Sequence, residues 1–297
     1  MWCFMSKTDS PSTSGAVVAS SGAERAAHTT WHMALTYDGS QYYGFQIQPG
    51  LPTVHAELEQ RLQKLFRRPE LRIKPSSRTD GGVHALDQHI SFVTPASDMP
   101  GESLTNILNR WLPMDIRVKW SRPVAPEFQA RKQATAKSYV YALYPGRRLP
   151  PFLADYCWHL RSSVNMVNMQ RAAEGMQGEH DFSSFAVSRN KPVSSCRRTL
   201  YRVEVIRGGA GQIFVHVLGD NFLYKMVRSI AGHLVNAGHQ QTWTPEDTEK
   251  VLAARDRSVV GTTAPAKGLF LAKVFFDHAT RRNFVPPVPP MDGLMTS

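Results

Sequence analysis

Apolar side chains recur along the chain at two spacings, one typical of helices and one typical of strands. The hydroxyl of Thr53 can cap a helix. The apolar residues after it recur at helical spacing, namely Val54, Leu58, Leu62, Leu65 and Phe66. The same period predicts helices over about residues 103–112, 166–177 and 221–237. A further helix is predicted to begin at Thr244, because Pro245 suits the first helical position and Asp247 can complete a capping box.

Other segments alternate apolar and polar residues as strands do. They lie at about 31–37, 73–78, 89–93, 138–144, 200–206, 213–218 and 269–276. Because these strands follow hairpin-like connections as well as helices, the order favours an α+β fold with an antiparallel sheet over a doubly wound parallel sheet. Two rounds of strands and helices are visible, so we expect an N-terminal half over 31–130 and a C-terminal half over 131–282.

The two ends differ in composition from the rest of the chain. Residues 1–30 are rich in Ser, Ala, Thr and Gly, a composition that buries too little apolar surface to become ordered, so we expect a flexible leader. Its Ser-rich, acid-poor character leaves an organellar presequence open. Residues 283–297 carry a run of prolines and are expected to form an extended tail.

Charge and cysteine content narrow the class of protein. The 297 residues include 35 Lys and Arg against 24 Asp and Glu, a formal net charge of +11, as expected for a phosphate-rich partner or for a membrane surface. The longest apolar runs are far shorter than the ~20 residues of a spanning helix, so no membrane span is expected. Cys3, Cys157 and Cys196 form no CxxC pair, which favours neither a disulfide framework nor a zinc site. A reducing compartment, the cytoplasm, fits best.

A short polar segment, SRTDGGVHA at 77–85, follows one of the predicted strands. If the chain is still extended there, Arg78 and Asp80 project from the same face, and the guanidinium holds the carboxylate ionised. Gly81 and Gly82 allow positive φ or the close approach of a ligand, so Asp80 is a potential nucleophile. From the local sequence alone, a type I′ hairpin turn is the commoner role of Asp-Gly.

This segment resembles the catalytic motif of the TruA family of tRNA pseudouridine synthases. Other segments resemble further motifs of that family in the same order: YDGSQYYGFQ at 37–46, FQAR at 128–131 with ATAKSY at 134–139, HDFSSF at 180–185, FLYKMVR at 222–228 and APAKGLFL at 264–271. The resemblance runs from about residue 32 to residue 290. Two positions depart from it, since Phe45 stands where tryptophan is usual and Gly81 where Lys, Arg or Ala is common.

The resemblance implies an enzyme that isomerises uridine to pseudouridine, with Asp80 as the catalytic nucleophile and no metal or other cofactor. In this chemistry a carboxylate either attacks the ribose C1′, as in retaining glycosidases, or attacks uracil C6, and both routes stay open.

The resemblance also implies roles for three further residues as substrate-binding groups. Tyr139 matches the tyrosine that stacks on the target uracil, although a core aromatic is the default for a residue in a strand. Arg228 matches the arginine that pairs with the catalytic carboxylate, and Arg78 matches the residue that fills the space left by the extruded base. His84 and His89 are at no metal-ligand spacing with further partners, so for both we expect a place in the core or a role in supporting neighbouring site residues.

The family fold implies two ferredoxin-like (RRM-like) halves that share one continuous antiparallel sheet, with helices on one side and the catalytic cleft between the halves. The implied substrate is the anticodon arm of tRNA at uridines 38, 39 and 40, and the implied assembly is a homodimer.

Two alternatives stay open: a non-catalytic protein that binds or folds tRNA on the same fold, and a small-molecule glycosidase-like enzyme. The second would need another carboxylate as general acid.

Overall fold

The computed structural model describes residues 28–187, 195–209 and 211–287. The strands are β1 (His28–Tyr37), β2 (Lys74–Pro75), β3 (His84–Pro95), β4 (Ile116–Val124), β5 (Ala136–Tyr144), β6 (Trp158–His159), β7 (Gly178–Asp181), β8 (Arg197–Arg207), β9 (Ile213–Gly219) and β10 (Leu269–Phe275). The α-helices are α1 (Val54–Phe66), α2 (Gly101–Trp111), α3 (Ala130–Gln133), α4 (Met166–Glu174), α5 (Met226–Gly238), α6 (Pro245–Ala254) and α7 (Ala279–Arg282). Of the predicted leader, residues 1–27 lie outside the described residues and the last three belong to β1. Of the predicted tail, residues 288–297 lie outside them as well.

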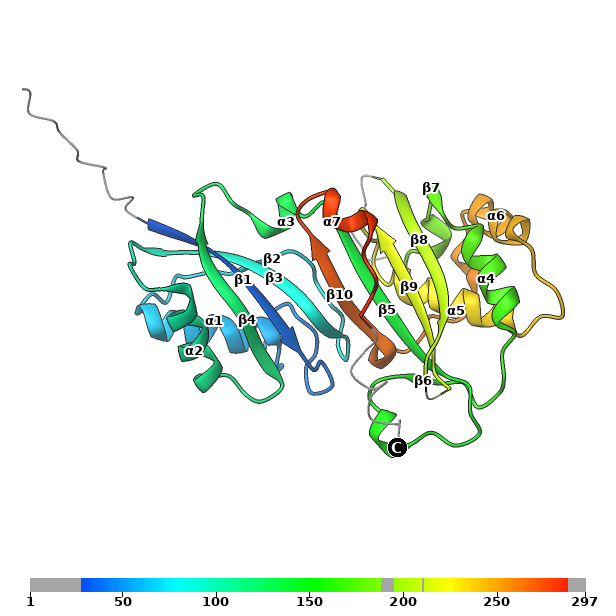
Figure 1. Ribbon diagram of the computed structural model, residues 1–297, viewed down its shortest axis with the longest axis horizontal. Helices are drawn as coiled ribbons and strands as arrows, with labels where there is room; N and C mark the ends of the chain where they lie inside the picture. The colour runs from blue at the N-terminus through cyan, green and yellow to red at the C-terminus, as the bar shows by residue number, and fades with distance from the viewer. Residues whose placement is uncertain (1–27, 188–194, 210, 288–297) are drawn as a thin grey trace, which may run out of the picture.

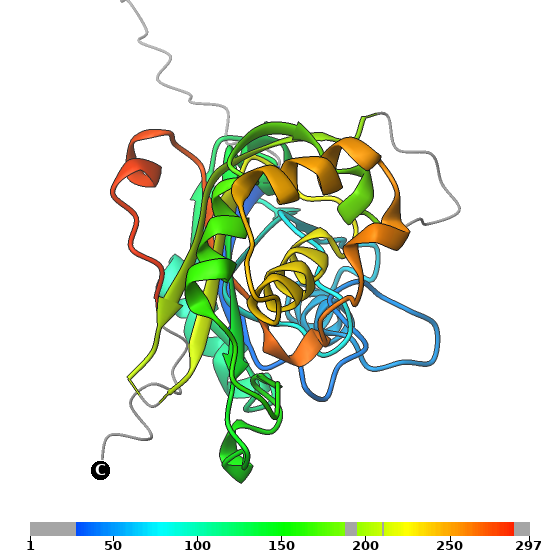
Figure 2. The same cartoon turned by 90° about the vertical axis from the view of Figure 1, so that its right-hand side faces the viewer.

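One mixed sheet runs through the molecule and carries helices mainly on one face (Figure 1). Its strand order is β4-β1-β3-β10-β5-β9-β8-β7, with β2 added beside β3 and β6 beside β5. Alternate residues of β1 and β5 belong to the same buried cluster as the apolar faces of α1, α2, α4, α5 and α6. The short helix α7 lies on the opposite face (Figure 2).

The sheet therefore departs from the predicted continuous antiparallel sheet with helices on one side only. Two pairs are parallel, β3 with β10 and β5 with β6. The β3–β10 pair joins the first part of the chain to the last, through Phe270 opposite His84 and Leu271 opposite Ala85. No turn connects these two strands, so packing sets their relative direction and hairpin connectivity does not.

Several elements differ in extent from the predicted ones. The strand expected over 73–78 covers only Lys74–Pro75, because the chain then leaves the sheet to form the loop that carries Asp80. The helix expected from residue 221 begins at Met226, since Lys225 adopts the left-handed conformation at φ 58°. Strand β4 was not predicted, although Ile116, Val118 and Trp120 alternate as a strand requires.

Caps behave as the sequence predicts. The Thr53 hydroxyl accepts a hydrogen bond from the backbone N–H of Ala56 at 3.3 Å, which satisfies one free donor of α1. At the start of α6 the backbone N–H of Thr244 donates to the Asp247 carboxylate at 3.1 Å, as part of a capping box.

Buried polar side chains join the two halves of the sheet. The His84 imidazole lies 3.1 Å from the carbonyl oxygens of both Asp155 and Lys267, and its other ring nitrogen accepts from the backbone N–H of Gly39. Asp87, buried on β3, receives the Lys273 ammonium of β10 at 3.1 Å. His89 lies against the same carboxylate at 3.0 Å, so His84 and His89 both have core roles, as predicted.

The buried imidazole of His233 on α5 makes stability depend on pH. Burial lowers the pKa of His233 to about 4, and its nearest polar contact is the Thr248 hydroxyl at 3.3 Å. The pKa is lowered on folding, so this stability is complete above the unfolded value of about 6.5 and is lost as pH falls toward 4. We expect wild-type protein to lose on the order of 3 kcal/mol more unfolding free energy between pH 7 and pH 4 than His233→Gln does, measured by urea denaturation. An equal loss in both proteins would contradict the assignment.

Candidate active site

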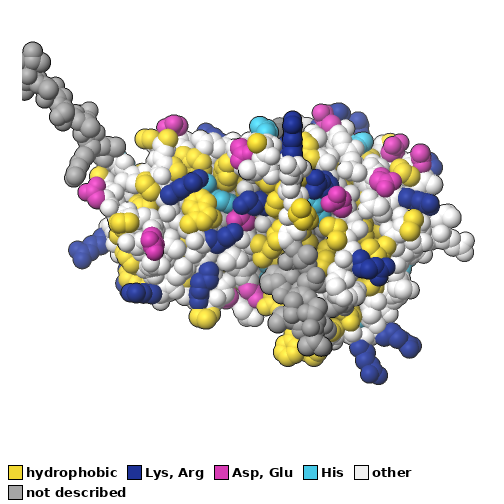
Figure 3. Space-filling view, in the orientation of Figure 1, with side chains coloured by type: hydrophobic (Ala, Val, Ile, Leu, Met, Phe, Trp, Pro, Cys, Tyr) yellow, Lys and Arg dark blue, Asp and Glu magenta, His cyan; other side chains and the backbone are white. Residues whose placement is uncertain are grey.

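A cleft of about 890 Å³ opens on the helical side of the sheet, between the 73–83 segment, β5 and the start of α5. Eight Lys and Arg residues line it: Lys74, Arg78, Arg131, Lys132, Lys137, Arg198, Lys225 and Arg228. Among the described lining residues, Asp80 is the only carboxylate. On the face shown in Figure 3, by contrast, Lys and Arg side chains are scattered and mixed with acidic ones. The cleft therefore has the charge distribution of a site for a polyanion that places one carboxylate against the ligand.

The loop that carries Asp80 is held by a neighbouring loop that follows β1. The backbone N–H of Phe45 donates to the Thr79 carbonyl at 3.0 Å, and the N–H of Gly82 donates to the Tyr42 carbonyl at 3.1 Å. Gly44, with φ +103°, is bridged to Asp80, and a Cβ there would lie 2.7 Å from the Thr79 carbonyl oxygen. This close approach of two backbones excludes a side chain at position 44 and fixes the position of the Asp80 loop.

The turn at Asp80 is not the type I′ hairpin turn that Asp-Gly most often forms. The N–H of Val83 donates to the Asp80 carbonyl at 3.1 Å, and only Gly82 of the two central residues has positive φ, at +76°. This combination is typical of a type II turn, which needs glycine at its third position alone. Gly81 therefore tolerates the side chains that the family often has there.

Arg228 holds the Asp80 carboxylate from the C-terminal half. Its Nη1 donates to Asp80 Oδ2 at 3.1 Å, while its Nε donates to the Ala264 carbonyl at 2.7 Å. Both side chains are largely buried, with 13% and 23% of their surfaces exposed. A guanidinium held at two points in this way orients the carboxylate and places a positive charge against it.

Arg78, in contrast, forms no ion pair with Asp80. The strand ends at Pro75, and Arg78 is an exposed side chain that lines the cleft. The predicted pairing of Arg78 with Asp80 is therefore not observed, and the arginine that contacts this carboxylate comes from a segment 148 residues later.

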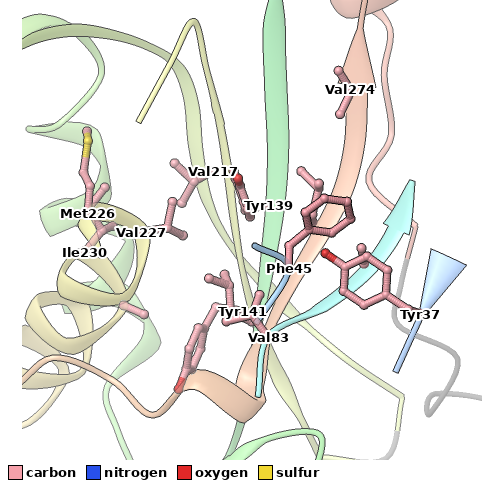
Figure 4. Close-up of a cluster of buried hydrophobic side chains, with 14 of the residues drawn as sticks. Tyr37, Phe45, Val83, Tyr139, Tyr141, Val217, Met226, Val227, Ile230 and Val274 are labelled. Atoms are coloured by element: carbon pink, nitrogen blue, oxygen red, sulfur yellow. The ribbon is translucent and has the colours of Figure 1, made fainter. Parts of the chain in front are cut away.

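Tyr139 lies on β5 at the floor of the cleft. Its hydroxyl is 2.9 Å from the Ser77 hydroxyl, and its ring meets Phe222 edge to face with the centroids 5.1 Å apart. Figure 4 shows Tyr139 and Tyr141 between Val227 of α5 and Phe45 of the loop that follows β1. Burial raises the pKa of Tyr139 to about 12, and the Asp80 carboxylate adds to this rise, so the phenol is protonated at neutral pH.

Two residues of the site were not singled out from the sequence. Ser77 orients the Tyr139 hydroxyl, and Asn221 accepts a hydrogen bond from Lys137 at 3.1 Å. Ser77 lies inside the recognised motif, but nothing in its spacing indicates contact with a residue of another strand. Asn221 lies in a stretch that resembles a helix in sequence and is a loop in the structure.

The arrangement combines one carboxylate, one guanidinium and one protonated phenol in a cleft lined by eight cationic side chains. A lone carboxylate can attack or stabilise an electron-poor carbon, whereas a glycosidase needs a second carboxyl group as acid. Within the described ranges, no group of three His, Cys, Asp or Glu side chains is placed to hold a metal ion. No described helix is long and apolar enough to cross a bilayer.

Comparison with known proteins gives a consistent result. A family model described as tRNA pseudouridine synthase matches residues 33–131 and 172–277. The chain is 38% identical over 245 residues to tRNA pseudouridine synthase A of Bacillus licheniformis, covering 82% of this chain and 98% of that one. It is 37% identical over 244 residues to the protein of the same name from Thermotoga maritima, covering 82% and 97%. The chain therefore belongs to the TruA family of tRNA pseudouridine synthases, a family of isomerases.

Proposed function

We propose that this protein converts uridine to pseudouridine in tRNA, within the anticodon stem-loop at positions 38, 39 and 40, with Asp80 as the nucleophile. The observation that carries the proposal is the Asp80–Arg228 pair, 3.1 Å apart in a cleft with eight cationic side chains. The cationic lining suits the RNA backbone, and the single carboxylate suits attack on one carbon of the nucleotide.

The proposed reaction is balanced without a co-reactant. The bond between ribose C1′ and uracil N1 breaks, the base turns, and a new bond joins C1′ to C5. C5 loses one proton and N1 gains one, so no oxidant or reductant is consumed. Asp80 forms a transient bond to either C1′ or C6 and is released unchanged.

Tyr139 and Arg78 act on the base in this proposal. An enzyme that changes a base must first take it out of the stack, and an aromatic ring then provides a surface on which the flipped base lies. Tyr139 is beside Asp80, and Ser77 holds its hydroxyl. Arg78 is exposed at the cleft, where its long side chain can enter the space that the base leaves.

We further propose that the chain consists of two ferredoxin-like halves that meet near residue 130. The support is strand order: β4-β1-β3 with β2 outside β3 in the first half, and β10-β5-β9-β8 in the second. Each half then contributes to the cleft, Asp80 from the first and Tyr139 and Arg228 from the second.

We propose a homodimer in the cytoplasm as the working form, and light scattering of the purified protein would give its mass.

The test of the proposed function is a pseudouridine assay on unmodified tRNA transcripts, resolved position by position, in buffer with chelator and no added cofactor. We expect new pseudouridine at one or more of positions 38, 39 and 40. Pseudouridine confined to other positions would contradict the anticodon assignment. Tight binding without conversion on several tRNAs would favour the alternative, a tRNA-binding or tRNA-folding protein.

A further inference from the structure

Lys137 is a buried cation in the wall of the cleft that the proposed chemistry does not use. Only 8% of its surface is exposed, and it lines the cleft from β5. Its ammonium donates to the Asn221 side-chain oxygen at 3.1 Å, and none of the ion pairs between described residues includes Lys137. Burying a charge without an opposite charge in contact lowers the stability of the folded state, so the fold keeps Lys137 at a cost in stability.

Other cations surround Lys137 instead of acids. Arg131 of α3 and Arg198 of β8 line the same end of the cleft, and both act electrostatically on Lys137. The Nε of Arg198 is buried and has no hydrogen-bond partner among the described residues. Among the described residues, the acid that acts on Lys137 is Asp220, whose Oδ1 already accepts from the backbone N–H of Thr199 at 3.2 Å. Clustered cations with an unpartnered N–H donor suit an anionic group such as a phosphate.

The position of Lys137 along β5 relates this cluster to the candidate active site. Lys137 and Tyr139 are two residues apart on one strand, so both side chains project from the same face, roughly 6.6 Å apart along the strand. A strand of RNA that lays a base against Tyr139 would thus bring a neighbouring phosphate to Lys137.

We propose that Lys137, with Arg131 and Arg198, forms a subsite for the backbone phosphate next to the target uridine. This inference rests on the proposed function for the identity of that uridine. The subsite would hold the strand while the base is extruded, and Asn221 would keep the ammonium in place.

The first test compares Lys137→Met and Lys137→Arg with wild-type protein in equilibrium binding to a tRNA transcript. We expect Lys137→Met to weaken binding about tenfold and to lower the slope of log Kd against log salt by about 0.7 to 1. Lys137→Arg keeps the charge and should restore most of the affinity. Lys250→Met, an exposed lysine on α6, is the matched control and should bind as wild type does.

Thermal unfolding distinguishes a ligand-binding role from a structural one. Replacing a buried cation with an apolar side chain of similar length should leave Tm unchanged or raise it. A fall in Tm that accompanies the loss of affinity, without rescue by Lys137→Arg, would overturn the proposal.

The second test locates the phosphate. Single backbone linkages of an anticodon stem-loop RNA are replaced by neutral methylphosphonates, and each RNA is titrated against wild-type and Lys137→Met proteins. A linkage beside the target uridine should weaken wild-type binding and have little further effect on Lys137→Met, because the two changes remove the same contact. Effects that add at every linkage, or wild-type affinity in Lys137→Met, would overturn the subsite.

The pH dependence of binding gives an independent test. Burial, together with the nearby charges of Arg131 and Arg198, lowers the pKa of Lys137 to about 8, and the Asp220 carboxylate opposes this lowering. The charged form binds phosphate, so wild-type affinity should fall between pH 7 and pH 9, whereas Lys137→Arg should keep its affinity. Parallel behaviour of the two proteins would contradict the proposal. The tests of the Lys137 variants measure tRNA binding alone. Failure of the proposed subsite is therefore seen separately from failure of the pseudouridine assay.

Discussion

The Asp80→Asn protein is expected to bind tRNA with nearly wild-type affinity and to form pseudouridine at least about 10⁴-fold more slowly. Asparagine has the size of aspartate and still accepts a hydrogen bond from Arg228, so the loop should keep its shape. The amide oxygen carries no charge and is a poor nucleophile, so neither proposed route of attack remains. Single-turnover formation of pseudouridine measures the loss, and filter binding measures the affinity.

Asp155→Asn is the matched control, because it makes the same change of Asp to Asn. Asp155 is an exposed loop residue that lies outside the described lining of the cleft. It should turn over as wild type does. Pseudouridine formation by Asp80→Asn at a rate close to wild type would show that Asp80 is not the nucleophile. Equal loss of binding and turnover would show that its role is in holding RNA.

The second large effect is expected at Arg228. Its guanidinium holds the Ala264 carbonyl through Nε and the Asp80 carboxylate through Nη1, two contacts that a single ammonium cannot make in the same geometry. We expect Arg228→Lys to reduce kcat by about 10² to 10³ and Arg228→Met to reduce it further, with smaller changes in tRNA affinity.

The pair of variants separates charge from geometry at this position. A lysine with wild-type kcat would show that positive charge alone is needed beside Asp80. A loss confined to KM in both variants would show that Arg228 binds RNA and does not position the carboxylate. Thermal unfolding of each variant is the control for folding, because Arg228 joins α5 to the segment before β10.

Several expectations from local sequence failed where contacts between distant segments decided the outcome. Arg78 is two residues from Asp80, yet the carboxylate pairs with Arg228, because the chain turns away from the sheet after Pro75. The residues before Met226 follow a helical pattern, but in the structure they form a loop that lines the cleft, and the side-chain oxygen of Asn221 accepts a hydrogen bond from Lys137. Propensity is weak compared with such tertiary contacts.

The sequence by itself determined the alternation of elements, the caps at Thr53 and Thr244, the excess of positive charge and, through its ordered motifs, the family. These features depend on neighbouring residues or on whole segments, and so they can be read along the chain. The tertiary structure alone decided which arginine meets Asp80, that β10 lies parallel to β3, and that Lys137 is buried among other cations in the wall of the cleft. Each of these depends on segments far apart in the chain, whose approach is set by packing across the whole sheet and leaves no periodic pattern in the sequence.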